Sequence, residues 1–185
     1  MLRRALLGLL ATVSMTAALV AGTAAQPAAA DVHAAVVTIT YSDAQAGEFV
    51  NAVAQGVAIW NASVTNVRIV KAAAGQRADV QVIADNGWPR ATLGPVRPGG
   101  RGTVWMGREA VNDGYSVVRI ASHEFGHILG LPDRKPGPCS SLMSGSSAGV
   151  SCTNPYPNST EASRVQSLYA GSFAATADTG QVVVD

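Results

Sequence analysis

One run of residues, Ala121 to Asp133, constrains this chain more than any other feature. It contains His123 and His127, which are four positions apart and therefore lie on the same face if the segment is helical. Two imidazoles at this spacing can bind one zinc ion. Glu124 points about 100° away around the helix, too far to share their ligand position, but it can still reach a water beside the metal. The pattern therefore predicts a helix that carries a metal site and a general base.

The third protein ligand should be a carboxylate, because the chain has only three histidines and the remaining one, His33, lies near the N-terminus. Gly130 can end the helix in a left-handed conformation, and Pro132 prevents its continuation. Asp133 follows directly, where its carboxylate can turn back to the metal. Two histidines, one carboxylate and an open fourth position are typical of a catalytic zinc site.

Two alternatives stay open on the residues alone. Glu161, on a later helix, could supply the third ligand in place of Asp133. The chain could also be a zinc-binding module without activity, although zinc binding does not need Glu124, so the glutamate favours an enzyme. Four acidic residues follow Glu124 in the sequence: Asp133, Glu161, Asp178 and Asp185.

The run H-E-F-G-H-I-L-G-L-P-D resembles the metzincin signature, with aspartate in place of the usual third histidine. Together with the segment C-S-S-L-M-S-G at 139–145, it is similar to the snapalysin family of small secreted neutral metalloproteases. The similarity also covers residues 59–61 and 151–158, so it spans about Val36 to Gly171. The resemblance implies an endopeptidase that hydrolyses extended polypeptides and favours an aromatic residue on the amine side of the cut bond. The implied site has one zinc per chain, bound by His123, His127 and Asp133, with Glu124 as the general base.

The resemblance also marks three further positions. Met143 corresponds to the methionine that packs beneath the metal in metzincins. Lys135 stands where the family has a tyrosine suited to steadying an oxyanion, and a cation could replace that hydrogen bond. The segment from Tyr115 to Arg119 has no carboxylate where relatives have residues suited to calcium, so no calcium site is predicted.

Residues 1–30 have the features of a secretory signal peptide. Arg3 and Arg4 precede an apolar stretch, and small residues allow cleavage after Ala25 or Ala30, with a short pro-segment to about residue 35. An uncleaved membrane anchor is the alternative, which the small residues at the end of the stretch disfavour. The sequence thus predicts a secreted, extracellular monomer without a membrane attachment after cleavage. A net charge of +1 and 14% charged residues offer no basic patch for nucleic acid.

The two cysteines, Cys139 and Cys152, predict one disulfide, since an even number in an exported chain favours pairing. A thiolate metal site is the alternative, but no histidine accompanies the pair.

The expected fold is α+β, and the resemblance makes it a metzincin-like zincin. It combines a small twisted mixed sheet with a long backing helix, an active-site helix and a C-terminal helix. A capping box at Ser42–Gln45 predicts a helix reaching Trp60, between two parallel strands. The resemblance makes Thr103–Met106 the antiparallel edge strand that binds substrate; the alternative is a core strand. The expected organisation is a catalytic domain at 36–171 and a loosely packed tail at 172–185. Expected strands are 36–41, 66–71, 78–84 and 103–106, and further helices are 117–129 and 159–170.

Overall fold

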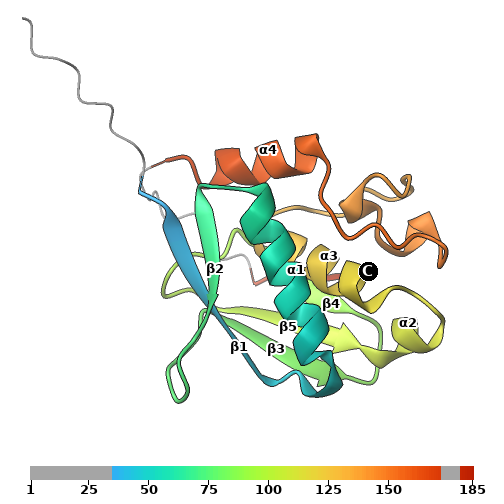
Figure 1. The fold of residues 1–185 in the computed structure, drawn as a ribbon, viewed down its shortest axis with the longest axis horizontal. Helices are drawn as coiled ribbons and strands as arrows, with labels where there is room; N and C mark the ends of the chain where they lie inside the picture. The colour runs from blue at the N-terminus through green and yellow to red at the C-terminus, as the bar shows by residue number, and fades with distance from the viewer. Residues whose placement is uncertain (1–34, 172–179) are drawn as a thin grey trace, which may run out of the picture. The chain divides into compact units, whose positions relative to one another are not determined.

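The computed structural model describes residues 35–171 and 180–185, so the predicted signal peptide at 1–30 lies outside the described residues. The described part confirms an α+β fold built on a six-stranded mixed sheet (Figure 1). The order across the sheet is β2-β1-β3-β5-β4-β6, in which β1, β2, β3 and β5 are parallel and β4 is antiparallel to β5 and to β6. The strands are β1 (Val37–Gln45), β2 (Val67–Lys71), β3 (Val80–Asp85), β4 (Arg90–Thr92), β5 (Gly102–Gly107) and β6 (Val182–Val184).

The alternating pattern of the strands sets which face of the sheet is covered. Burial alternates along the first part of β3 and most of β5: Val80, Val82, Val104 and Met106 are buried, while the residues between the members of each pair are partly exposed. Successive side chains of a strand point to opposite faces, so one face of the sheet carries the core. These β-branched and apolar residues form strands because they pack well on a pleated, half-buried surface.

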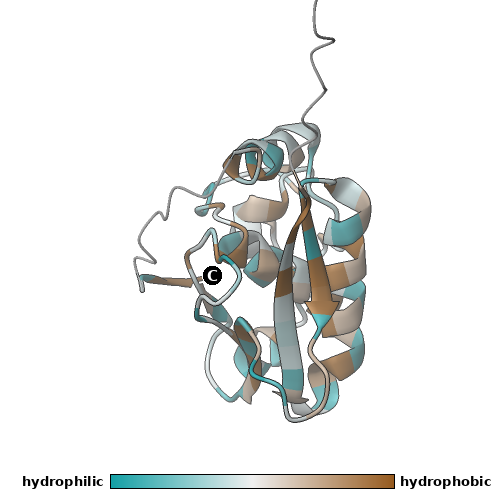
Figure 2. Ribbon diagram, turned by 90° about the vertical axis from the view of Figure 1, so that its left-hand side faces the viewer, coloured by the Kyte–Doolittle hydropathy of each residue, from teal (hydrophilic) through white to brown (hydrophobic). Residues whose placement is uncertain are grey.

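Two helices, α1 (Val50–Ser63) and α3 (Val117–Ile128), pack against this core. Trp60 of α1 donates its indole N–H to the carbonyl of Ser122 in α3 at 2.8 Å. Tyr41 of β1 meets Phe125 of α3 edge to face, with ring centroids 5.9 Å apart. One face of α1 is buried, at Ala52, Val53, Gly56, Val57 and Trp60, and Figure 2 shows that hydrophilic and hydrophobic residues are mixed along the helix. The predicted long helix is thus present, and it packs against α3 as well as against the core of the sheet.

Two shorter elements follow β5 and α3 in the chain. The helix α2 (Arg108–Asn112) connects β5 to α3, and the 3₁₀ segment η2 (Leu142–Ala148) lies beyond the predicted site run. The C-terminal helix α4 (Ser159–Leu168) begins with a capping box formed by Asn158 and Glu161. The predicted disulfide between Cys139 and Cys152 is confirmed, and it links the start and end of the segment that contains η2.

The predicted start of the long helix is wrong. The strand β1 continues through Gln45, and a 3₁₀ turn, η1 (Gly47–Phe49), precedes α1. Ser42 does not form a capping box; its hydroxyl accepts a bond from Ala44 N at 3.5 Å. Gly47 has a φ of 54°, which interrupts the helical path, and strand pairing outweighs the local cap signal.

The assignment of Thr103–Met106 as an antiparallel edge strand is also wrong. This segment is β5, an inner strand that pairs in parallel with β3 on one side and antiparallel with β4 on the other. The antiparallel strand is β4, a three-residue element that lies between β3 and β5 in the chain and outside the expected strands. It is too short for the alternation of apolar and polar residues to reveal it, so its pairing comes from tertiary structure.

The expectation of a loose tail does not hold for its last residues. Val182–Val184 form β6, which pairs with β4 in the register Arg90 with Val184 and Thr92 with Val182. Residues 172–179 lie outside the described residues. Among the described helices, none combines the length and the hydropathy needed to cross a membrane.

Candidate metal centre

The helix α3 is positioned by clear local signals at both ends. Ser116 caps its start by accepting a bond from Arg119 N, as the sequence predicts. At the other end Gly130 has a φ of 96°, which favours glycine, and the following Leu131 N donates to Gly126 O at 2.9 Å. This left-handed turn reverses the chain, so Asp133 returns to the side of the helix that carries the histidines.

Both histidine rings of α3 are oriented by backbone carbonyls. The Nδ1 of His123 lies 3.0 Å from the carbonyl oxygen of Leu142, and the Nδ1 of His127 lies 2.7 Å from that of Leu131. A carbonyl only accepts, so each Nδ1 must carry the hydrogen in these bonds. In the neutral rings the lone pairs are therefore on Nε2, the arrangement that metal-binding histidines adopt.

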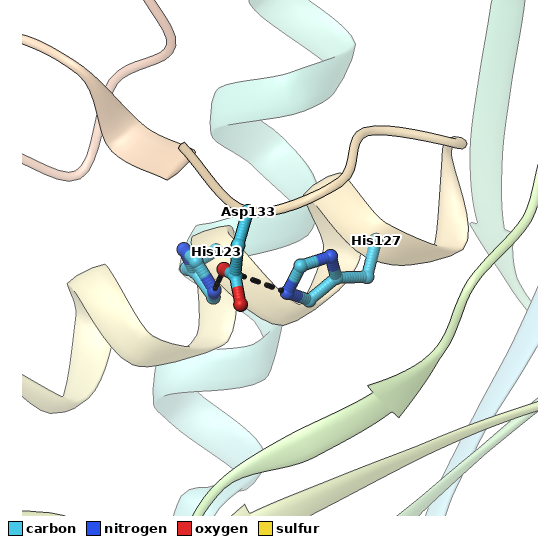
Figure 3. Close-up of side chains that lie close together, drawn as sticks. All are labelled: His123, His127 and Asp133. Carbon is cyan, nitrogen blue, oxygen red and sulfur yellow. Dashed lines mark ion pairs between the residues drawn. The ribbon is translucent and has the colours of Figure 1, made fainter. Parts of the chain in front are cut away.

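The two Nε2 atoms and one oxygen of Asp133 converge on a common point (Figure 3). Asp133 Oδ1 is 3.3 Å from His123 Nε2 and 3.5 Å from His127 Nε2. Ligand atoms around a tetrahedral zinc, with bonds of about 2.0–2.1 Å, are separated by about 3.3 Å. Both distances from Asp133 Oδ1 thus match the edge of a zinc tetrahedron, and the ligand atoms of the three residues all lie within 4.8 Å of one another.

The polar atoms of this centre are buried but make no hydrogen bond within the described part of the chain. They are His123 Nε2, His127 Nε2, Asp133 Oδ1 and both carboxylate oxygens of Glu124. A buried polar atom without a partner costs free energy, and a cluster of five calls for an explanation. Metal ligation by the first three atoms, and a bound water for Glu124, would satisfy them.

The electrostatics of the centre reflect the burial of several charges together. Burial raises the pKa of Glu124 to about 8. Burial also lowers the pKa of His123, but Asp133 and Asp185 outweigh it and bring the value to about 9. Against the effect of burial, the two histidines hold the pKa of Asp133 well below its usual range. Burial lowers the pKa of His127, with His123 adding to the effect.

Glu161 does not belong to this centre, so the alternative that makes it the third ligand is disfavoured. Its carboxylate accepts bonds from Ser141 Oγ at 2.7 Å, Leu142 N at 3.1 Å and Met143 N at 2.9 Å. It also closes the capping box of α4 with Asn158. Glu161 therefore ties α4 to the segment that holds the ring of His123.

Arg119 holds the same segment from the opposite side. Its side chain is buried, and its guanidinium donates to the carbonyls of Asn154 and Ser141 and to Ser144 Oγ. Met143 is fully buried, and its sulfur packs against Gly126, where an added Cβ would lie only 2.6 Å from it. The position of Met143 beneath α3 is thus the one that the sequence resemblance implies.

The structure adds Asp185, which sequence reasoning did not select. Its Oδ1 is 3.6 Å from His123 Nε2 and 2.9 Å from Lys135 Nζ, and it accepts a bond from Ser146 N. Lys135 Nζ also lies 3.3 Å from Asp133 Oδ2. The lysine that stands in place of the family tyrosine is therefore in contact with a proposed metal ligand. The sequence signal for Asp185 was weak: it is one of four acidic residues after Glu124 and is distant from the motif.

The helix α3 carries H-E-x-x-H and packs beneath a mixed sheet, and the aspartate that follows it turns back to the two histidines. These features are typical of zinc metalloproteases. The profile of the Streptomyces extracellular neutral proteinase (M7) family matches residues 36–172. The chain is a member of this extracellular proteinase family.

Curated relatives agree with this assignment. The extracellular small neutral protease of Streptomyces caespitosus is 43% identical over 134 residues, which cover 72% of this chain and 98% of the relative. Proteins of the same name from Streptomyces sp. (strain C5) and Streptomyces lividans are 44% and 43% identical, over 78% and 84% of this chain. The matches span 61% and 65% of the length of these last two relatives.

Among solved structures, the high choriolytic enzyme 1, a hatching enzyme zinc-protease of the medaka Oryzias latipes, aligns with a TM-score of 0.49. The two sequences are 18% identical, and the alignment covers 72% of this chain and 90% of that enzyme.

Replacing Arg119 with methionine should destabilise the fold by about 1.5–3 kcal/mol, because hydrogen bonds from a charged donor are lost and buried carbonyls are left unpaired. Denaturant unfolding with the disulfide intact measures this loss. Arg164→Met on the exposed side of α4 is the matched control, expected to change stability by less than about 0.5 kcal/mol. Equal effects of the two substitutions would contradict the role given to Arg119.

Proposed function

We propose that this chain is a secreted zinc endopeptidase, active as a monomer, that hydrolyses peptide bonds of extended polypeptides. One observation carries the proposal: Asp133 Oδ1 lies at zinc-ligand spacing from both His123 Nε2 and His127 Nε2, while carbonyls fix both histidine rings through Nδ1. One zinc per chain would be held by these three residues. Membership of an extracellular proteinase family supports the same reaction and compartment.

Glu124 is the proposed general base. Possible ligand atoms of Glu124, His123 and Asp185 lie within 4.8 Å of one another. Neither carboxylate oxygen of Glu124 has a hydrogen-bond partner among the described residues. A bound zinc supplies a Lewis acid that polarises a carbonyl and lowers the pKa of water. Glu124 would accept a proton from the attacking water and pass it to the leaving amine. Lys135, whose ammonium lies 3.3 Å from Asp133 Oδ2, would offset negative charge that develops at the carbonyl oxygen.

The proposed preference for an aromatic residue on the amine side requires a pocket beside the metal ligands. A cavity of about 540 Å³ is lined in part by Pro132 and Arg134, the sequence neighbours of Asp133, and by Leu131 and Met143. Thr160 of α4 is also part of the lining. The lining also includes polar residues such as Arg134 and Ser141, so it is the volume beside an apolar part of the wall that suits a large side chain and supports the preference that the family resemblance implies.

The ligand set is tested by zinc content. Asp133→Asn should lose most of the bound zinc, because a neutral amide replaces an anionic ligand. Glu161→Gln should keep it, because Glu161 bonds to the backbone near Met143 and not to the centre. Metal analysis of the purified variants by mass spectrometry measures both. Full zinc occupancy in Asp133→Asn would remove this residue from the ligand set.

The general base is tested by Glu124→Gln, which retains the shape of the side chain but cannot take up a proton. We expect kcat for a peptide substrate to fall by about 100- to 10,000-fold, the usual contribution of acid–base catalysis. Zinc content should stay the same, since Glu124 is not a proposed ligand. If the variant and the original chain both bind zinc and are equally inactive, the chain is a binding module and not an enzyme.

The aromatic preference is tested by filling the cavity. Thr160→Trp should lower kcat/KM for peptides with an aromatic residue on the amine side more than for peptides with alanine there. Thr153→Trp is a matched control, because Thr153 is exposed and is not among the residues that line the cavity. Cleavage profiling of a peptide library before substitution provides the baseline, and a flat profile on the amine side would refute the preference.

A further inference from the structure

The last described residues occupy the edge of the sheet that a polypeptide substrate would use. β6 runs antiparallel to β4 along the side of β4 that faces away from β5. Its pairing is extended at both ends, by a bond from Leu93 N to Gln181 O at 2.7 Å and one from Asp185 N to Pro89 O at 3.1 Å. Extended peptides bind to proteins in this way, by adding a strand to an exposed sheet edge. With β6 in place, the backbone groups of β4 on this side are already paired.

β6 also leads directly into the metal centre. Asp185 follows its last residue, and the Asp185 side chain is only 6% exposed. Its Oδ1 lies 3.6 Å from His123 Nε2 and is held by Lys135 Nζ and Ser146 N. The carboxylate has space there because of Gly145, where an added Cβ would lie 1.9 Å from that oxygen.

The side from which Asp185 approaches matters for the chemistry. Asp185 clusters with His123 and Glu124, whereas the proposed ligand set is His123, His127 and Asp133. The two clusters share only His123, so Asp185 lies on the Glu124 side of the centre. This is the side on which the attacking water and the substrate carbonyl must meet.

The direction of β6 matches one half of a substrate. Val182–Val184 precede the residue that reaches the metal centre, as the residues on the acyl side of a cut bond precede the scissile carbonyl. Figure 2 shows this short apolar strand ending at the C-terminal mark. The amine side of the centre, with the cavity beside Asp133, is lined by none of residues 181–185.

The strand is held in a way that allows its displacement. Val182 and Val184 are 43% and 54% exposed, so β6 gains little from apolar burial. Its attachment depends on backbone pairing and on the buried contacts of Asp185, and a substrate backbone can offer the same pairing. The matching family profile ends at residue 172, before this strand.

We propose that residues Gln181–Asp185 are a built-in product mimic, which fills the acyl side of the substrate groove and places the Asp185 carboxylate beside the metal. The proposal rests on the proposed peptidase function. The segment competes with substrate, so the chain is partly self-inhibited until a substrate displaces the segment or proteolysis removes it.

The central test compares the full chain with a version that ends at Gly180. Because the segment competes with substrate, truncation should lower KM for a long peptide by about tenfold if about a tenth of the molecules have a free groove, and kcat should stay the same. Asp185→Asn, which keeps β6 but removes the charge, should lower KM by a smaller factor. Asp113→Asn, at an exposed carboxylate, is the matched control and should leave KM unchanged.

A second measurement does not depend on activity. In the cobalt-substituted protein, truncation at Gly180 should change the visible absorption spectrum of the metal. Adding the pentapeptide Gln-Val-Val-Val-Asp to the truncated chain should restore the original spectrum and inhibit competitively. The same peptide with Asn in place of Asp should do both more weakly.

The outcomes separate this proposal from the peptidase assignment. If no version cleaves peptides but the spectrum changes and the pentapeptide restores it, residues 181–185 do bind beside the metal, but the peptidase function fails and the role of product mimic fails with it. If truncation leaves KM and the spectrum unchanged, or lowers kcat, β6 is only a structural cover for the sheet edge and the proposal is overturned. Should the truncated chain fail to fold, Val183→Pro, which disrupts the centre of β6, must lower KM in its place; an unchanged KM in that variant overturns the proposal equally.

Discussion

The metal centre depends on two hydrogen bonds, from the Nδ1 atoms of His123 and His127 to the carbonyl oxygens of Leu142 and Leu131. These bonds fix the tautomer of each ring and direct both Nε2 atoms to one point. A carbonyl can do this only if the chain after α3 folds back beneath the helix. The turn at Gly130 begins that return, and Glu161 and Arg119 hold its far end by pairing with the backbone of residues 141–143.

The burial of charge explains why so many residues support this segment. Glu124 and the two histidines are almost fully buried, and Asp133 and Asp185 are largely enclosed beside them. Buried charges are tolerated when partners compensate them, and a divalent cation would compensate the excess of carboxylates here. Lys135 supplies part of the compensation by bridging Asp133 and Asp185. The lysine thereby links the centre to Asp185, the residue after β6, through an ion pair.

The sheet edge joins the fold to the proposed control of activity. A strand of three residues, β4, separates the parallel part of the sheet from β6. Sheet edges offer unpaired backbone groups, and proteins cover them when pairing with other chains would be harmful. A protease needs such an edge for its substrate, so a weakly buried strand of its own can protect the edge and remain displaceable. In this proposal the same short segment would govern both the coverage of the edge and access to the metal centre.

The local sequence determined the features that depend on neighbouring residues. The spacing of His123 and His127, the Ser116 cap and the break at Gly130 all act within a few residues, so α3 and the return of Asp133 were predictable. The Cys139–Cys152 bridge was predictable from the cysteine count. Tertiary structure alone decided the rest, because it depends on contacts between distant segments. Strand pairing extended β1 through the apparent cap at Ser42 and made Thr103–Met106 an inner strand. Asp185 reached His123 only because β6 pairs with β4, and three valines in an otherwise unpatterned tail carry no local signal of that partner.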